Sequence, residues 1–269
     1  MKTKKYKILV LSDLKEGTNN SLQSAVSLSK IINGDIEFFH VRKPTDIVER
    51  ESQLSAMRTI NKEHIVIEKK IKDIIEPISK NYDMKVKYSF AFGNVKSEIK
   101  DYIESSKPDI IVLGQRVSNP FQIIGDSITQ FVLKEYEGII MISANNNSLM
   151  PSKKMTLGVL NGSNKIFNTE LSKDLIMRAT IPLKSFKIIN SQKQTTNTSV
   201  RSGEEIVEFV FEQNANTMDT LSKYLLKNNI DLLCVDRVKD TTIDTHNSIE
   251  IPLKEVVRKL NVSLLVSGI

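Results

Sequence analysis

Residues 7–12 read KILVLS, an uninterrupted apolar run that ends at Asp13. Strands of a parallel sheet that is covered on both faces lose the alternation of polar and apolar residues, so this run indicates a buried parallel strand. Similar runs recur along the first half, and segments with helical spacing of their apolar residues separate them. The expected strands are 35–41, 86–92, 109–113 and 138–143, and the expected helices are 21–32, 49–80, 95–105 and 126–135. This alternation predicts an α/β domain with a doubly wound, five-stranded parallel sheet of Rossmann-like type.

A weaker copy of the pattern follows the polar segment 144–152, which we interpret as a linker. The clearest match is the run 231–235, which repeats 109–113; Tyr224 and Tyr102 each lie seven residues before these runs. The chain is therefore expected to hold two such domains in tandem, over residues 1–146 and 153–269.

Further matches between the halves are less complete. Asn161 stands where Asp13 stood after the first strand, and Phe209-Val210-Phe211 resembles Phe90-Ala91-Phe92. The long helix of residues 49–80 has only the polar segment 191–205 in its place, so the second copy is expected to lack one helix. We expect the sheet face that this loss uncovers to be buried against the first half.

Composition limits the class of protein. With 269 residues, 40% of them hydrophobic and 26% charged, the chain is of ordinary globular type. Its net charge of +6 is spread over both halves, which does not indicate a nucleic-acid surface. Cys234 is the only cysteine, which excludes a disulfide framework or a cysteine-cluster metal site. No apolar run approaches the ~20 residues of a membrane helix. We expect a cytoplasmic protein without membrane contact.

The residue patterns of common enzymes are missing from the sequence. His40, His64 and His246 have no second ligand type at a metal-binding spacing. Cys234 lies within an apolar run, where a core residue is expected. The sequence contains no Gly-x-Ser-x-Gly, no Walker loop and no Gly-x-Gly-x-x-Gly. We therefore expect neither a catalytic site nor a metal site.

Several features in order resemble the universal stress protein family. Its members carry Asp after strand one, His-Val at the end of strand two, Gly before the third helix and Asp-x-Ile-Val-x-Gly at strand four. Here these are Asp13, His40-Val41, Gly93 and the segment 109–114. The resemblance covers nearly the whole chain in a tandem form whose second domain is strongly degenerate. It implies a sheet of strand order 3-2-1-4-5 with helices on both faces.

The resemblance also points to a nucleotide site, but one with a damaged phosphate motif. Nucleotide-binding members carry Gly-x-x-Gly, about nine residues, and then Gly-Ser or Gly-Thr, which brings phosphate to a helix N-terminus. Here Val117 replaces the second glycine, the spacer 118–124 is two residues short and Asp126 takes the hydroxyl position. A carboxylate there caps the helix and repels phosphate. The candidate adenine-nucleotide cleft consists of Asp13, Val41, Gly114, Arg116, Gly125, Asp126 and Ser127.

These residues support two functional hypotheses. The first is a non-enzymatic stress-response or signalling protein that requires no cofactor and acts through protein partners. The second is a regulatory protein that binds ATP or AMP in its first domain. Val117 and Asp126 favour the first hypothesis. Because family dimers join through the fifth strand, we expect the two domains to pair as an internal pseudo-dimer through residues 139–142 and 263–266. The whole chain could also form a homodimer.

Overall fold

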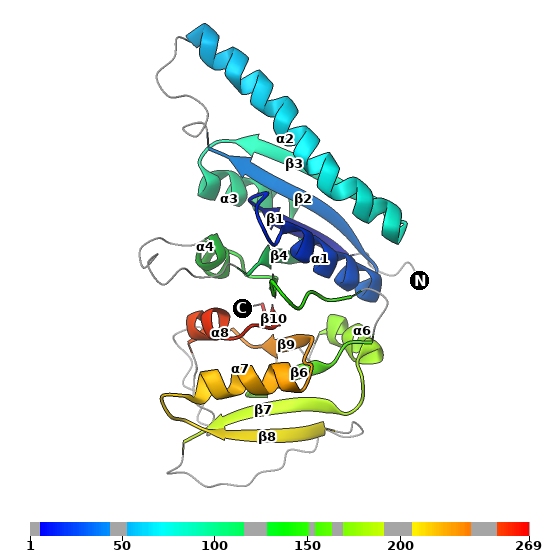
Figure 1. Ribbon diagram of the computed structural model, residues 1–269, viewed down its shortest axis with the longest axis vertical. Helices are drawn as coiled ribbons and strands as arrows, with labels where there is room; N and C mark the ends of the chain where they lie inside the picture. The colour runs from blue at the N-terminus through cyan, green and yellow to red at the C-terminus, as the bar shows by residue number, and fades with distance from the viewer. Residues whose placement is uncertain are drawn as a thin grey trace.

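The computed structural model describes most of the chain (Figure 1). The described residues are 6–43, 53–115, 128–150, 154–162, 169–190, 206–237 and 252–268. They form one mixed α/β structure in which a single sheet of ten strands runs through both halves of the chain. The predicted segments 116–127 and 191–205 lie outside the described residues.

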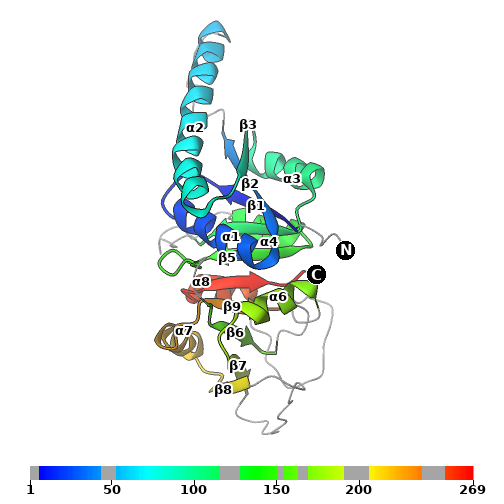
Figure 2. The same cartoon turned by 90° about the vertical axis from the view of Figure 1, so that its right-hand side faces the viewer.

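The first half follows the predicted alternation of strands and helices. A 30-residue helix, α2, projects well beyond the end of the sheet, as Figures 1 and 2 show. The elements are β1 (Tyr6–Ser12), α1 (Thr18–Ile32), β2 (Gly34–Arg42), α2 (Gln53–Tyr82), β3 (Val86–Phe92), α3 (Val95–Ser106), β4 (Ile110–Gly114), α4 (Ile128–Glu135) and β5 (Ile139–Ser143).

The second half repeats this order with elements of equal or shorter length, and its described residues contain no counterpart of α2. Its described elements are β6 (Leu157–Leu160), α6 (Glu170–Arg178), β7 (Leu183–Ile189), β8 (Ile206–Glu212), α7 (Thr217–Lys227), β9 (Leu232–Val235), α8 (Leu253–Lys259) and β10 (Ser263–Val266). Within each half all strand pairs are parallel.

The strand order is β3-β2-β1-β4-β5-β10-β9-β6-β7-β8. The first five strands have the predicted order 3-2-1-4-5, and the last five show the same order in mirror sequence. The halves meet where β5 and β10 pair antiparallel, with Met141 opposite Leu265. Both side chains are fully buried. The strands predicted to form the junction are therefore the strands that form it.

The core has two layers, one on each face of the sheet, and both layers continue across the junction. One layer holds the apolar sides of α1, α2 and α6. The other holds those of α3, α4, α7 and α8. Strands in the middle of the sheet are buried on both faces. Their sequences are therefore continuous apolar runs.

The segment predicted as a linker is fixed to α1 rather than extended between two bodies. The Ser24 hydroxyl accepts a hydrogen bond from the Leu149 amide at 3.1 Å, and the Ser27 hydroxyl donates to the Leu149 carbonyl at 2.7 Å. The Leu149 side chain is buried in the core. Ser24 also bonds Ser143 at the end of β5, at 2.8 Å. The serines on α1 thus hold residues 143–149 in place.

Both halves contain the same local motif at the start of their fourth strand. The Asp109 amide donates to the Lys7 carbonyl, and its carboxylate accepts from the Lys7 amide, both at 2.9 Å. The Asp231 amide donates to the Thr156 carbonyl at 3.0 Å, and its carboxylate accepts from the Thr156 amide at 2.7 Å. Asp109 and Asp231 therefore occupy equivalent positions, which fixes the correspondence of all neighbouring strands.

This correspondence corrects the predicted match of Asn161 with Asp13. Since Ile8 pairs with Ile110 and Leu157 pairs with Leu232, β6 aligns with β1 so that Asn161 corresponds to Ser12. Gly162 takes the place of Asp13. A match based on residue type alone was one residue in error.

The match of the aromatic triplets 90–92 and 209–211 is also wrong by one residue. Along the ladders Phe90 lies beside His40, and Val210 lies beside Lys187, which makes Phe90 and Val210 equivalent. A shift of one residue in a strand moves every side chain to the other face. Accordingly the phenylalanines of 90–92 pack on the α2 side, and those of 209–211 pack on the α7 side.

We expected the first half to cover the sheet face opposite α7, but it does not cover the described part of this face in β8. β8 lies at the outer edge of the sheet, at the far end from the junction. Val210, on the face that α2 covers in the first half, is 52% exposed. The expectation was wrong because the halves join edge to edge, which leaves their outer strands at opposite ends.

Candidate functional site

Three of the predicted site residues come together at the carboxyl edge of the first half of the sheet. Asp13 directly follows β1, Val41 lies near the end of β2 and Gly114 ends β4. These strands are neighbours in the order β2-β1-β4. The crossing from β1 to β4 is also where the strand order reverses, which is the usual ligand position in such sheets. The other predicted site residues, Arg116, Gly125, Asp126 and Ser127, lie outside the described residues, and so does Val117.

Asp13 lies in a tight turn between β1 and α1. Its carboxylate accepts a hydrogen bond from the Lys15 amide at 3.1 Å, and the side chain is exposed. The preceding Ser12 hydroxyl accepts from the Leu14 amide at 3.1 Å and bonds the Thr18 hydroxyl at 2.8 Å. Leu14 adopts φ 58°, a left-handed conformation that is uncommon for a bulky residue. The turn therefore holds the Asp13 carboxylate at the rim of the edge.

Glycine is required at Gly17 more clearly than at Gly114. Gly17 has φ 89° before the first turn of α1, and a Cβ there would lie 3.0 Å from the Asn145 side chain. At Gly114 the nearest neighbour of an added Cβ would be the Ser21 hydroxyl at 3.6 Å, an ordinary contact. A side chain at position 114 would thus make ordinary contacts with α1, so its packing does not require glycine, whereas Gly17 permits the turn that brings α1 close to the edge.

His40 is a buried polar residue at this edge that the predicted site did not include. Its Nδ1 lies 2.8 Å from the Ser12 carbonyl, so this nitrogen carries the hydrogen and donates to the neighbouring strand. Burial lowers the pKa of His40 below its usual value of 6.5, and the hydrogen bond to Ser12 opposes this effect. Arg42 and Lys70 lower the pKa further, while Asp13 raises it. The imidazole is therefore neutral at pH 7. Its place at a strand end was visible in the sequence, but its contact with Ser12 was not.

The equivalent edge of the second half is occupied by contacts of the chain with itself. The Asn161 carboxamide accepts from the Ile188 amide at 2.9 Å, which joins β6 to β7. Gly162, which corresponds to Asp13, offers no carboxylate and adopts φ 87°. Arg237, two residues after β9, is 6% exposed and donates to several main-chain carbonyls. This edge does not reproduce the arrangement around Asp13.

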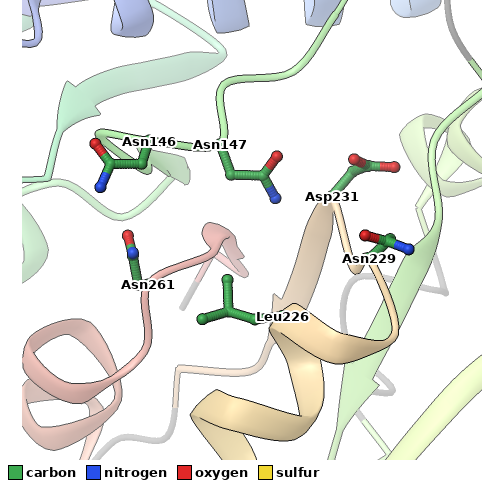
Figure 3. Close-up of a pocket in the computed structure, with 6 residues that line it drawn as sticks. All are labelled: Asn146, Asn147, Leu226, Asn229, Asp231 and Asn261. Carbon is green, nitrogen blue, oxygen red and sulfur yellow. The ribbon is translucent and has the colours of Figure 1, made fainter.

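A separate cavity of about 250 Å³ lies between the halves, away from the predicted site (Figure 3). It is polar, and Figure 3 shows asparagine side chains on several sides of it. The Asn147 carboxamide already donates to the Ile230 carbonyl at 3.2 Å. The lining residues are Asn146, Asn147, Leu226, Asn229, Asp231 and Asn261.

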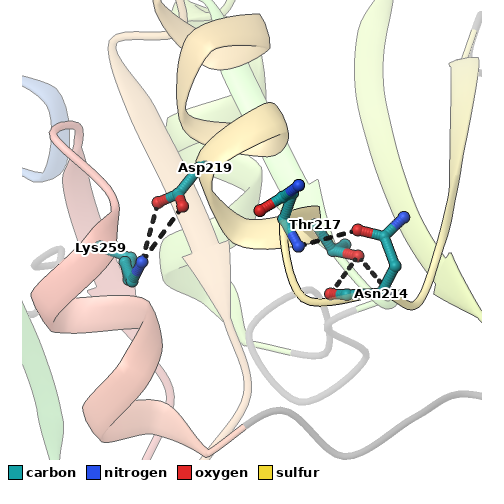
Figure 4. A network of polar contacts seen from close by, with 5 residues as sticks. Asn214, Thr217, Asp219 and Lys259 are labelled. Carbon is teal, nitrogen blue, oxygen red and sulfur yellow. Dashed lines mark hydrogen bonds and ion pairs between the residues drawn. The ribbon is translucent and has the colours of Figure 1, made fainter.

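The turn from β8 to α7 contains a polar network that fixes the start of this helix (Figure 4). The Asn214 carboxamide accepts from the Asn216 amide at 2.8 Å, and the Thr217 hydroxyl donates to the Glu212 carbonyl at 2.7 Å. Lys259 of α8 bonds Asp219 of α7 at 2.9 Å. Both partners of this ion pair are partly exposed, so its contribution to stability is small. The network is structural and offers no arrangement for catalysis.

Two further searches of the described parts of the chain bear on function. In these parts, no group of three His, Cys, Asp or Glu side chains is placed to hold a metal ion. Across the same ranges, no helix combines the length and the apolar character needed to cross a membrane. Cys234 is fully buried in β9, and burial raises the pKa of its thiol.

Comparison with known proteins gives a match to one family. The model of the universal stress protein family matches residues 6–137. No curated protein that was compared with the chain matches it.

Solved structures resemble the chain over almost its whole length. A universal stress protein from Archaeoglobus fulgidus DSM 4304 gives a TM-score of 0.68 at 14% identity, over 97% of this chain and 98% of that chain. A functionally unknown protein from Pseudomonas aeruginosa PAO1 gives 0.57 at 11% identity, over 98% and 93%. A putative universal stress protein from Pseudomonas aeruginosa UCBPP-PA14 gives 0.55 at 11% identity, over 98% and 94%. At these identities the likeness shows the fold alone.

Proposed function

We propose that this chain, which matches the model of the universal stress protein family over residues 6–137, is a non-enzymatic stress-response or signalling protein that acts through contacts with other proteins. Residues 153–269 are, in this proposal, a degenerate second domain of the same family. The repeated strand order and the equivalent contacts of Asp109 and Asp231 support this interpretation. The second domain then serves for contacts rather than for ligand binding.

The observation that carries the proposal is the apolar surface at the outer end of the second half. Ile206 and Val210 of the edge strand β8 are 37% and 52% exposed on the sheet face opposite α7, and we call them the β8 surface. Ile181, at 73% exposure, lies two residues before β7, whose first residue pairs with Ile206. Apolar side chains on an edge strand favour association with another protein.

Site-specific photo-crosslinking tests this proposal. A photoreactive amino acid at Val210 should form adducts with a protein in stressed cells, and the same label at Leu226 is the control. Leu226 is also apolar and 45% exposed, but it lies at the end of α7. The adducts at Val210 should disappear when Ile206→Lys adds a charge to the same face of the strand. An equal yield from both positions, or no adducts at Val210, would contradict the proposal.

A second candidate function is binding of ATP or AMP in the first domain. The observation in its favour is the placement of Asp13, Val41 and Gly114 at the ends of three adjacent strands. Such a position fits an adenine and a ribose without requiring a triphosphate cradle. Calorimetric titration with ATP and with adenosine distinguishes the two candidates, because only the second requires measurable affinity.

A further inference from the structure

The side chain of Gln115 reaches from the first half of the chain into the second. Its Nε2 amide donates to the Val257 carbonyl at 3.0 Å and to the Leu260 carbonyl at 2.7 Å. These carbonyls belong to the last turn of α8, where a helix leaves its carbonyls without partners of its own. Gln115 therefore caps α8 from the opposite half.

Arg237 makes the corresponding contact in the other direction. Its Nη1 donates to the Leu133 carbonyl at 2.8 Å and to the Tyr136 carbonyl at 2.5 Å, at the end of α4. Its Nη2 donates to the Gly138 carbonyl at 2.6 Å. A cation is also favourable at a helix C-terminus because it faces the negative end of the helix dipole.

The two contacts are equivalent in position. Gln115 lies six residues after Asp109, and Arg237 lies six residues after Asp231. The two carbonyls that Gln115 Nε2 bonds and the two that Arg237 Nη1 bonds are three residues apart in each case. The main chain follows a similar pattern. The Gln115 amide donates to the carbonyl of Ser143 at the end of β5, and the Arg237 amide donates to the hydroxyl of Ser267 directly after β10, both at 2.8 Å.

We propose that Gln115 and Arg237 form a reciprocal clamp, through which each half of the chain holds the last helix of the other half. Neither α4 nor α8 is then stabilised only by its own half. Gln115 directly follows Gly114, so the clamp also links the candidate ligand edge of the first half to α8 in the second. This link to the edge matters for ligand binding only if the second candidate function holds, whereas the clamp itself does not depend on it.

Hydrogen exchange on the full chain tests the contact of Gln115 with α8. Gln115→Glu keeps the size of the side chain but replaces the donating amide with a carboxylate facing helix carbonyls. We expect amide exchange in α8 to become about tenfold faster or more, while α4 keeps its protection. Gln115→Arg, which supplies the donors that Arg237 uses, should leave exchange in α8 close to that of the unchanged protein. Gln213→Glu, at an exposed position, is the matched control for the added charge.

Substitution of Arg237 should give the opposite pattern of amide exchange in the two helices. Arg237→Met removes every side-chain donor and is expected to speed exchange in α4 more than in α8. Because this substitution removes a buried group and could unfold the chain, Arg237→Gln is measured beside it and should give a smaller effect at the same helix. The proposal is overturned if Gln115→Glu leaves α8 unchanged, or if either substitution loosens only the helix of its own half.

Discussion

Phe90 in β3 and Val210 in β8 occupy equivalent positions in the two halves, but only Phe90 is packed against a helix. The Phe90 ring lies 4.5 Å from the ring of His64 on α2 and joins the core beneath this helix. Val210 is 52% exposed on the same face of the sheet. The two outer strands have therefore placed their aromatic residues on opposite faces, in each case on the face that a described helix covers.

This difference predicts unequal effects of truncation at the two positions. Phe90→Ala should lower the free energy of unfolding by about 2 kcal/mol or more, because it leaves a void beneath α2. Val210→Ala should change it by less than about 0.5 kcal/mol, because the side chain is already in water. Urea unfolding of both variants measures the two values. Equal losses would mean that the face around Val210 is covered in solution.

A second prediction concerns the buried edge of the junction. Leu265→Ala should lower the free energy of unfolding by about 2–5 kcal/mol, since this side chain is fully buried beside Met141. Both halves should still unfold in one transition, because the core layers cross the junction. Leu226→Ala, at an exposed apolar position, is the control and should cost less than about 0.5 kcal/mol. Two separate transitions in the unchanged protein would show that the halves are independent.

A third prediction follows from the buried imidazole at the candidate site. The folded state lowers the pKa of His40 below 6.5, so the unfolded chain binds a proton more readily. The contribution of the neutral His40 is therefore complete above pH 6.5 and is lost as the pH falls toward the folded pKa. One proton accounts for a slope of at most about 1.4 kcal/mol per pH unit.

Unfolding free energies between pH 7.5 and 5 measure this slope. His40→Gln should flatten it. Parallel curves for the unchanged protein and His40→Gln would show that other groups cause the pH dependence.

A fourth prediction concerns the two residues that interrupt the phosphate motif. We expect the chain to bind ATP no more tightly than adenosine, because a carboxylate placed as the sequence predicts for Asp126 would repel the phosphates and cap the helix in their place. Val117→Gly combined with Asp126→Ser should raise the ratio of ATP affinity to adenosine affinity by roughly tenfold to a hundredfold. Both positions lie outside the described residues, so this prediction rests on the sequence.

Calorimetry at fixed salt and Mg²⁺ gives the affinity ratio for both proteins. Tight binding of ATP by the unchanged chain, with no gain in the double variant, would mean that other groups hold the phosphates. The nucleotide-binding hypothesis would then replace the proposal of action through protein contacts. A nucleotide bound beside Asn161 would contradict the expectation that any nucleotide binds in the first domain.

The sequence allowed the central strands to be predicted well, because burial on both faces leaves an apolar run that few other structures produce. Residues 109–113 and 231–235 show this clearly, and each run begins with the aspartate that bonds the neighbouring strand. The outer strands were matched one residue out of register. Alternating aromatic residues look the same in either register, and only the neighbouring helices decide which face is apolar.

The candidate site was predictable to the same extent as the strand ends. Parallel strands bring Asp13, Val41 and Gly114 to one edge whatever the details of their loops. The contact between His40 and Ser12 depends on the register of two strands that are separated by a helix, and residue types do not encode it. The direction of Gln115 was equally hidden, because its acceptors are main-chain carbonyls more than 140 residues away.

The antiparallel junction of β5 and β10 also has a consequence for how the chain can change over generations. In a symmetric homodimer one gene position supplies both copies of every contact, so each substitution is made twice. Here the equivalent positions 115 and 237 are encoded separately, and one carries an amide while the other carries a guanidinium. A single chain can therefore specialise one side of its internal interface while the other side stays as it was.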